Sequence, residues 1–241
     1  RSRGLGDVYK RQTYIDAGAV EDMSSYVTDE DKKEYKYLSN GNMMDGQYGW
    51  PLVTGVPFVL YYNEDILNAL GEKAPETWDD FARICQEATK DTDGDGKVDQ
   101  YGFACGMNTS DIGAMQILNA YYYSALWQNG GQVYNDDLKS VSFADEAGKE
   151  AVTWLKGLTS YMNEDFMSLS WSDAFSNVFG AGKAAFGITR SSQTDGTTFA
   201  ETYPDLNWNF VTSLKNKDFG TFGATDCLTL MSACEDKDLA M

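Results

Sequence analysis

The chain has 241 residues, of which 42% are hydrophobic and 14% aromatic, so it can bury a sizeable core and its composition argues against intrinsic disorder. Its 19 basic against 37 acidic residues give a net charge of −18, which makes nucleic acid and anionic membranes poor partners. The absence of histidine excludes His-based catalytic triads and His metal sites.

The first twelve residues differ in character from the rest, because they are basic in an otherwise acidic chain. The string from Asp7 to Gln12 resembles the translation of a transposon-end sequencing adapter. We therefore interpret residues 1–12 as a library scar or a disordered leader and leave them out of the fold prediction, with a short basic arm as the alternative. No stretch approaches the roughly 18 consecutive apolar residues of a transmembrane helix.

The first half of the chain after residue 12 predicts one buried strand and two helices. Residues 13–47 are polar and turn-rich, whereas residues 56–62 form a nearly continuous apolar run that is typical of a strand buried on both faces. Pro57 places that run at a sheet edge or at a strand start. A short helix ends at Gly71, and Thr77 is predicted to cap a longer one. The apolar face of the longer helix is made by Trp78, Phe81, Ala82, Cys85 and Ala88.

Helices and strands continue to alternate over the second half, which predicts the α/β class. Strands are expected at 101–104, 183–189, 207–212 and 222–231, and helices at 111–129, 145–159, 173–179 and from residue 232 to the end.

The four cysteines, Cys85, Cys105, Cys227 and Cys234, contain no CxxC pair, so a zinc site is not expected. They are interpreted as small buried thiols. A disulfide joining the first two or the last two remains an alternative.

A dense carboxylate loop follows the longer helix and resembles a calcium-binding EF-hand loop in its spacing. Carboxylates occupy positions 1, 3, 5 and 9, a carbonyl at position 7 adds a ligand, and Gly96 stands at position 6. Position 12 is Gly102 instead of the usual glutamate, so a cage needs a ligand from elsewhere. No cofactor is expected to be required; a structural Ca²⁺ or a plain charged turn are the two interpretations. The candidate ligands are Asp91, Asp93, Asp95, Lys97 and Asp99.

Several segments, in this order, resemble one family over roughly residues 13–241. They are Gly49-Trp50-Pro51 with Leu60-Tyr61-Tyr62-Asn63, Pro75 to Phe81, Asp93 to Lys97 with Tyr101-Gly102-Phe103, Gln128 to Gly131, Phe179 to Phe186, and Lys237 to Ala240. The ordered set resembles the extracellular solute-binding proteins of family 1, the maltose-binding-like receptors of ABC sugar importers.

The resemblance implies a periplasmic-binding-protein-like (type II) fold, in which two α/β lobes joined by a hinge close on a ligand. Residues 56–222 would form a nearly complete second lobe. Residues 13–53 and 223–241 would form part of the first, with hinge crossings near 53–56 and 222–226. The resemblance further implies that the chain is truncated at both ends and that a signal peptide, of the lipoprotein or the periplasmic type, precedes it.

The function that the resemblance implies is non-catalytic capture of a carbohydrate, expected to be an oligosaccharide, for import. The expected partners are the sugar and the permease subunits of the transporter. The receptor is expected to be a monomer in the periplasm or a lipoprotein on the cell surface, with no nucleic-acid partner.

Sugar binding needs flat aromatic rings for the C–H faces of the sugar and planar polar groups for its hydroxyls. At the first crossing, the resemblance points to Trp50, Thr54 and Gly55. Among residues 121–123, one or two tyrosines are expected to face the cleft, with Tyr121 and Tyr122 as the candidates, because consecutive helical residues point about 100° apart. Asn119 is their polar companion.

After the strand 183–189 the family commonly places an aromatic contact, but this sequence has Arg190 and Ser192 there. This departure puts a simple maltodextrin ligand in doubt. Arg190 would hold a uronate carboxylate or a sugar hydroxyl, and a surface salt bridge is the alternative. Trp171 is the further aromatic candidate, and Asp226 stands at the second crossing.

Two other functions stay open at this point. Asp173 and Asp226 would be the carboxylate pair of a glycosidase, although no motif selects an acid and a nucleophile. A receptor for a polyamine or a peptide is the other alternative, since an acidic surface suits a cation.

Overall fold

The computed structural model describes residues 13–43, 45–109, 113–135, 140–191 and 197–241, and the chain divides into two compact units. Unit 1 comprises Arg1–Val56 together with Gly223–Met241, and unit 2 comprises Pro57–Phe222. The expected crossings, near 53–56 and 222–226, lie at these two divisions; hinge motion there stays a prediction. The leader interpretation of residues 1–12 falls outside the described residues.

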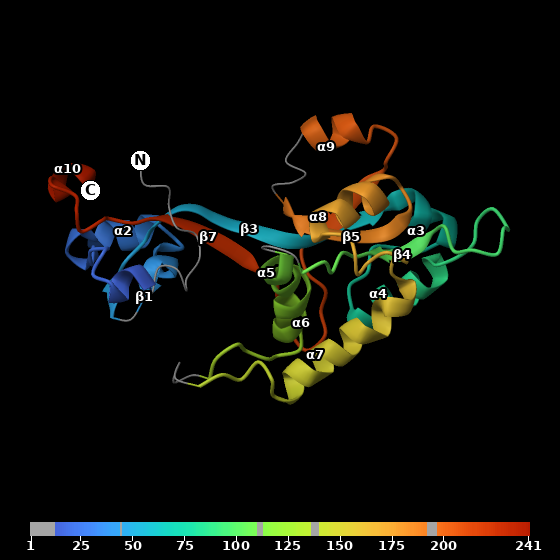
Figure 1. The fold of residues 1–241 in the computed structure, drawn as a ribbon, viewed down its shortest axis with the longest axis horizontal. Helices are drawn as coiled ribbons and strands as arrows, with labels where there is room; N and C mark the ends of the chain where they lie inside the picture. Colours follow the sequence, from blue (N-terminus) through green and yellow to red (C-terminus); the bar gives the residue numbers. More distant parts are fainter. Residues whose placement is uncertain (1–12, 44, 110–112, 136–139, 192–196) are drawn as a thin grey trace. The chain divides into compact units, whose positions relative to one another are not determined.

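Unit 2 is built on a mixed sheet whose strands lie in the order β4-β5-β3-β6 (Figure 1). β4 and β5 run parallel, whereas β3 is antiparallel to both β5 and β6. This arrangement confirms the α/β class. The strands are β3 (Trp50–Asn63), β4 (Tyr101–Ala104), β5 (Ala184–Arg190) and β6 (Trp208–Val211).

The central strand β3 carries core residues on both faces, as predicted. Phe58 and Leu60 belong to one hydrophobic cluster, and Val59 and Tyr61 to the other. Helices α4 (Trp78–Ala88) and α7 (Glu146–Gly157) cover the first face (Figure 1), whereas the π-helix η5 (Phe175–Gly180) and α9 (Thr197–Thr202) contribute to the cluster on the other. The expectation for Pro57 was wrong, because β3 begins at Trp50 and Pro57 lies inside it. Pairing with β5 begins one residue later, at Phe58, so the missing N–H of proline falls outside that ladder.

The two predicted helix boundaries after β3 are confirmed. Asn63 caps α3 (Glu64–Leu70), which ends at Gly71 in the left-handed conformation with φ of 72°. Thr77 caps α4 (Trp78–Ala88), and Asp80 completes a capping box by bonding back to the Thr77 amide. The buried face of α4 consists of Trp78, Phe81, Ile84, Cys85 and Ala88, with Ala82 partly buried beside it.

Two segments predicted as continuous α-helix contain π-helical turns. The first runs through α5 (Gly113–Ile117), the π-helix η3 (Leu118–Tyr122) and α6 (Tyr123–Gln128). The second runs through α8 (Trp171–Ala174) and the π-helix η5 (Phe175–Gly180). Hydrophobic periodicity over five or six residues does not separate a π turn from an α turn. The second segment starts at Trp171 because the Ser170 hydroxyl accepts from the Asp173 amide.

The remaining helices of unit 2 contribute buried residues to its two cores, Ala151 and Leu158 to one and Phe199 to the other. The helix predicted at 145–159 is α7, which begins after the capping residue Asp145. The bounds are α7 (Glu146–Gly157), the 3-10 helix η4 (Leu158–Tyr161) and α9 (Thr197–Thr202).

Unit 1 contains short elements that match the polar, turn-rich sequence of residues 13–47. Val20 forms a bridge with Met231, which joins the two stretches of chain in this unit. The predicted C-terminal helix begins later than expected, at Lys237, because Asp236 and not Ser232 caps it. The elements are η1 (Ser24–Tyr26), α2 (Asp29–Glu34), η2 (Leu38–Gly41), β1 (Asn42–Met43), β2 (Gly46–Gln47), β7 (Gly223–Leu228) and α10 (Lys237–Ala240).

The four cysteines are free thiols, and three of them are buried. The structure therefore supports neither disulfide alternative. Burial raises the pKa of the Cys105 thiol to about 12, which makes it unreactive at neutral pH. None of the helices in the described part of the chain is long and apolar enough to cross a membrane.

Candidate ligand-binding site

The carboxyl ends of β4 and β5 meet at one edge of the unit 2 sheet. The two strands are parallel, and Ala104, the last residue of β4, is paired with Gly187 of β5. β5 then extends to Arg190. In open α/β sheets ligands bind beyond the carboxyl ends of the strands. This edge is therefore where the topology favours a site.

Four side chains from four elements converge at this edge, and we call them the Arg190 cluster: Phe58, Gln116, Trp171 and Arg190. The guanidinium carbon of Arg190 lies 5.6 Å from the centroid of the Phe58 ring and 5.9 Å from that of Trp171. One guanidinium nitrogen of Arg190 donates to Gln116 Oε1 at 3.1 Å. The Phe58 and Trp171 rings meet edge to face, with centroids 5.6 Å apart. These contacts hold Arg190 in one orientation.

The cluster combines the two kinds of group that recognise a sugar. Trp171 and Arg190 are half-buried, so each keeps surface for a ligand, while Phe58 and Gln116 are buried beneath them. An indole ring offers an apolar face to C–H bonds, and a guanidinium offers up to five N–H donors in one plane. The sequence analysis named Trp171 and Arg190, and the structure brings these two together.

The tyrosines of the helix do not join the cluster. Tyr121 is buried in the main core, where its hydroxyl accepts from the Gly106 amide at 3.3 Å. Burial raises the pKa of the Tyr121 hydroxyl well above 10.0. Its place in the core argues against a direct ligand contact. Asn119, the companion residue, is buried on η3.

Tyr122 lies in a separate groove of about 760 Å³ between η3, α6 and α7. Its hydroxyl donates to the Phe143 carbonyl. The groove is large enough for a ligand, but its lining is dominated by apolar side chains such as Val133 and Val152. Few polar groups converge there, so it suits a sugar less well than the Arg190 cluster.

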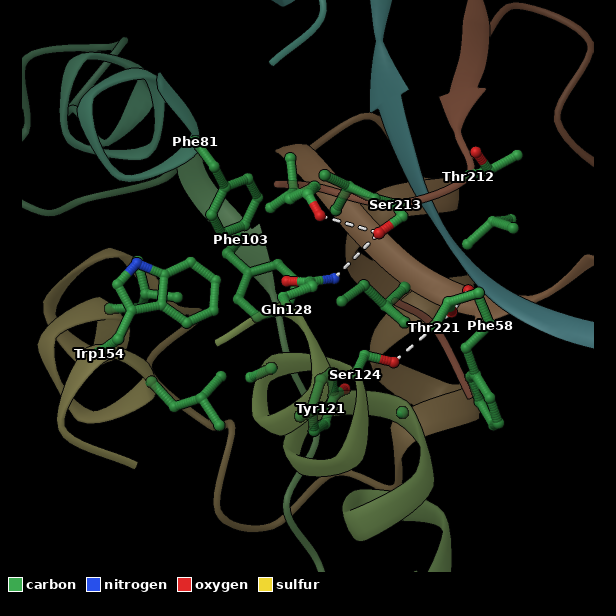
Figure 2. A pocket seen from close by; sticks show the side chains of 18 residues that line it. Phe58, Phe81, Phe103, Tyr121, Ser124, Gln128, Trp154, Thr212, Ser213 and Thr221 are labelled. Carbon is green, nitrogen blue, oxygen red and sulfur yellow. Dashed lines mark hydrogen bonds between the residues drawn. The ribbon is translucent and has the colours of Figure 1, made fainter. Parts of the chain in front are cut away.

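A small cavity in the core of unit 2 is not a sugar site. Figure 2 shows Gln128 and Ser213 at its centre, joined by a hydrogen bond, with Phe81, Phe103 and Trp154 among the side chains around them. Its volume is about 40 Å³, room for a water molecule or little more. Ligand pockets typically reach about 300–1,000 Å³.

In unit 1, Trp50 lines a hollow of about 510 Å³ whose lining is aromatic and acidic. Its ring meets that of Tyr35 edge to face, with centroids 5.4 Å apart. The Tyr26 hydroxyl in the same hollow donates to an oxygen of Asp238 at 3.1 Å. Aromatic rings beside carboxylates match the groups that sugars contact, so Trp50 remains a candidate.

For four other predicted contacts, the described part of the chain shows no interaction that marks them as part of a site. Thr54 and Gly55 lie in β3, and Asp226 is exposed on β7. Ser192 falls outside the described residues.

The carboxylate loop gathers three of its predicted calcium ligands. Oxygens of Asp91, Asp93 and Asp95 all lie within 4.8 Å of one another. Asp91 accepts from the amides of Gly94 and Gly96, and these hydrogen bonds lower its pKa. Asp99 is not part of this group and accepts from the amide and the hydroxyl of Thr92, while the Lys97 amide donates to Asp95. A calcium ion here stays a prediction.

Sequence reasoning missed Phe58 and Gln116 as parts of the site. Phe58 was recognised only as one residue of an apolar strand. Gln116 carries no sequence signal, since it reaches Arg190 across 74 residues of chain.

Comparison with known proteins finds similarity to binding proteins in each case. Residues 5–241 match a family model described as bacterial extracellular solute-binding protein. A protein of Brucella abortus (strain 2308) named as a binding protein is 26% identical over 242 residues, which cover 94% of this chain and 53% of the relative. The chain thus spans about half the length of that curated relative.

Two solved structures of ABC transporter binding proteins have the same fold. One, from Thermotoga lettingae with bound alpha-D-tagatose, has a TM-score of 0.73 and 18% identity, and the match covers 95% of this chain and 57% of that one. The other, Lmo0181 from Listeria monocytogenes in complex with cycloalternan, has a TM-score of 0.70 and 19% identity, covering 95% and 56%.

Proposed function

Because the chain belongs to the family of bacterial extracellular solute-binding proteins, we propose that it is the substrate-binding component of an ABC importer and that it captures a carbohydrate, in particular an oligosaccharide. The Arg190 cluster is the observation that carries this proposal. Its half-buried indole and guanidinium stand at the sheet edge where α/β proteins bind ligands. Structural neighbours with bound tagatose and cycloalternan give the same class of ligand.

The action proposed is binding without chemistry. The family consists of binding proteins and not of enzymes, which argues against the glycosidase alternative. The ligand contacts proposed in unit 2 are Trp171 and Arg190, and Trp50 of unit 1 is proposed as a further contact. Thr54, Gly55 and Asp226 would add polar contacts.

The family description places the protein outside the cytoplasm. We further propose that it works as a monomer in the periplasm or as a lipoprotein on the cell surface. It would deliver its ligand to the permease subunits of the transporter.

A thermal-shift screen tests the ligand class. The protein is expressed from its complete open reading frame and heated with neutral oligosaccharides, uronides, polyamines and peptides. A ligand at 100 times its Kd adds about 2.7 kcal/mol to stability, a readable shift. The proposal expects a stabilising saccharide. Stabilisation by a polyamine or a peptide, with none by any saccharide, would contradict it. Release of reducing sugar from an oligosaccharide would overturn the non-catalytic assignment.

A further inference from the structure

The described residues contain two arginines, and their surroundings differ. Arg83, on α4, donates to Glu72 through two nitrogens, at 2.6 and 2.9 Å, and to Glu87 at 3.2 Å. Among the residues that the structure describes, no carboxylate forms an ion pair with Arg190. Arg190 bonds instead to the neutral amide of Gln116. One arginine is thus neutralised by the protein and the other is not.

This difference is notable in a chain of net charge −18, where 37 acidic residues are available as partners. A half-buried guanidinium without a counter-ion has lost part of its hydration and gained no ion pair in return. The rings of Phe58 and Trp171 offset part of that loss through cation–π attraction. They also keep the charge in place at the sheet edge instead of letting it reach out to surface carboxylates.

The remaining N–H groups of Arg190 define what can bind. A guanidinium has five N–H donors in a fixed plane, and Gln116 accepts from one nitrogen. A carboxylate matches the fork of two parallel N–H groups and forms a short, charge-assisted pair with it. A neutral hydroxyl accepts one hydrogen bond there and leaves the charge uncompensated.

We propose that the ligand is an acidic saccharide, that Arg190 binds its carboxylate, and that Trp171 packs against the sugar ring. This inference rests on the proposed function. The long-range field of the acidic protein opposes an anion, but salt screens it over about 8 Å at physiological ionic strength. Direct pairing with a fixed guanidinium acts at contact distance and is screened much less. Arg190 would then be the residue that selects charged over neutral sugars.

The test compares two ligands with the same sugar backbone, a trigalacturonate and its fully methyl-esterified form, in which each carboxylate has become a neutral ester. Both are titrated by isothermal calorimetry into the protein from the complete open reading frame. Glucose 6-phosphate is titrated as well, to test whether the site binds an anionic group other than a carboxylate. The variants are Arg190→Gln, Arg190→Lys and the control Arg83→Gln, which makes the same charge change at the arginine already paired within the protein.

The acid should bind at least about tenfold more tightly than the ester, the usual scale of one charge-assisted pair. Arg190→Gln should abolish that preference, Arg190→Lys should retain part of it, and Arg83→Gln should leave it intact. Equal binding of acid and ester, or a preference that survives Arg190→Gln, would overturn the acidic ligand while the carbohydrate receptor stands. Tighter binding of glucose 6-phosphate than of trigalacturonate would overturn the assignment of a carboxylate as the group that Arg190 binds. Binding of no saccharide, acidic or neutral, to the folded protein would overturn both this inference and the proposed function.

Discussion

Gln128 is the buried polar residue whose loss should harm unit 2 most clearly. Its amide oxygen accepts from Trp78 Nε1 at 2.7 Å, and its amide nitrogen donates to the Gly220 carbonyl at 2.8 Å. Trp78 belongs to α4, whereas Gly220 lies just before the chain leaves unit 2 after Phe222. Gln128 therefore ties the departing segment to the core that supports the sheet edge.

The variant Gln128→Leu keeps the size of the side chain and removes these two bonds, together with the longer one to the Ser213 hydroxyl at 3.4 Å. The Gly220 carbonyl retains a second donor, the Ser213 hydroxyl at 2.9 Å, so it remains satisfied. Trp78 Nε1 has no such substitute and becomes a buried donor without a partner. An orphaned donor costs about 1–3 kcal/mol and a lost hydrogen bond about 1 kcal/mol, which gives about 2–4 kcal/mol in total.

The assay is thermal unfolding followed by tryptophan fluorescence, on protein from the complete open reading frame. The expected fall in Tm is about 5–15 °C, since 1 kcal/mol corresponds to about 2–4 °C in a domain of this size. Gln132→Leu, at an exposed glutamine beyond α6, is the matched control. Adding Trp78→Phe to Gln128→Leu removes the orphaned donor and should make the double variant more stable than additivity predicts. A Tm change no larger than that of the control would refute the reasoning.

Four further outcomes are expected. Gly102→Ala should destabilise the protein by more than about 2 kcal/mol, because the new Cβ would clash with the backbone of Cys85. Gly157→Ala, with open space around the new Cβ, should be neutral or stabilising in the same melts. Hydrogen bonds from Thr77 lower the pKa of Asp80 below 3.8 in the folded protein. Because the pKa of this carboxyl is lower in the folded than in the unfolded state, the ionised carboxylate stabilises the fold above pH 3.8, and this stabilisation is lost as the pH falls through the lowered pKa. Asp80→Asn should therefore reduce Tm at pH 7 and lose that effect in acid, and a deficit that persists unchanged in strong acid would contradict the linkage. A thiol titration should find four free thiols after denaturation, three of them protected in the native state, and fewer than four would indicate a disulfide. If the loop 91–99 binds structural calcium, EDTA should lower Tm and added Ca²⁺ should restore it, and a Tm unmoved by EDTA would argue for a plain charged turn.

The sequence predicted best what neighbouring residues determine. The capping of α4 by Thr77, with Asp80 three residues on, and the end of α3 at Gly71 both depend on contacts within one turn. The strand at residues 56–62 was predicted from its unbroken apolar composition, which reports burial on both faces. These local signals were enough to give the α/β class.

The candidate site was predicted in part, because tertiary contacts build it. Trp171 and Arg190 stood out as residue types that bind sugars, but their meeting depends on how α8 packs against the sheet. Tyr121 has the same chemistry as Tyr122, yet the turn of η3 places it in the core. Gln116 and Phe58 became part of the site only through contacts that no local pattern reports.

The most direct measurement of the central claim is the affinity of the best saccharide from the screen for the Trp171→Ala variant. If the saccharide binds at the Arg190 cluster, loss of the indole should weaken binding by about tenfold or more, the scale of one aromatic face on a ligand. Trp127→Ala, at a half-buried tryptophan of α6 that packs against Phe222 and lies outside the cluster, is the control and should bind normally. Unchanged affinity in a folded Trp171→Ala protein would place the ligand elsewhere and contradict the account.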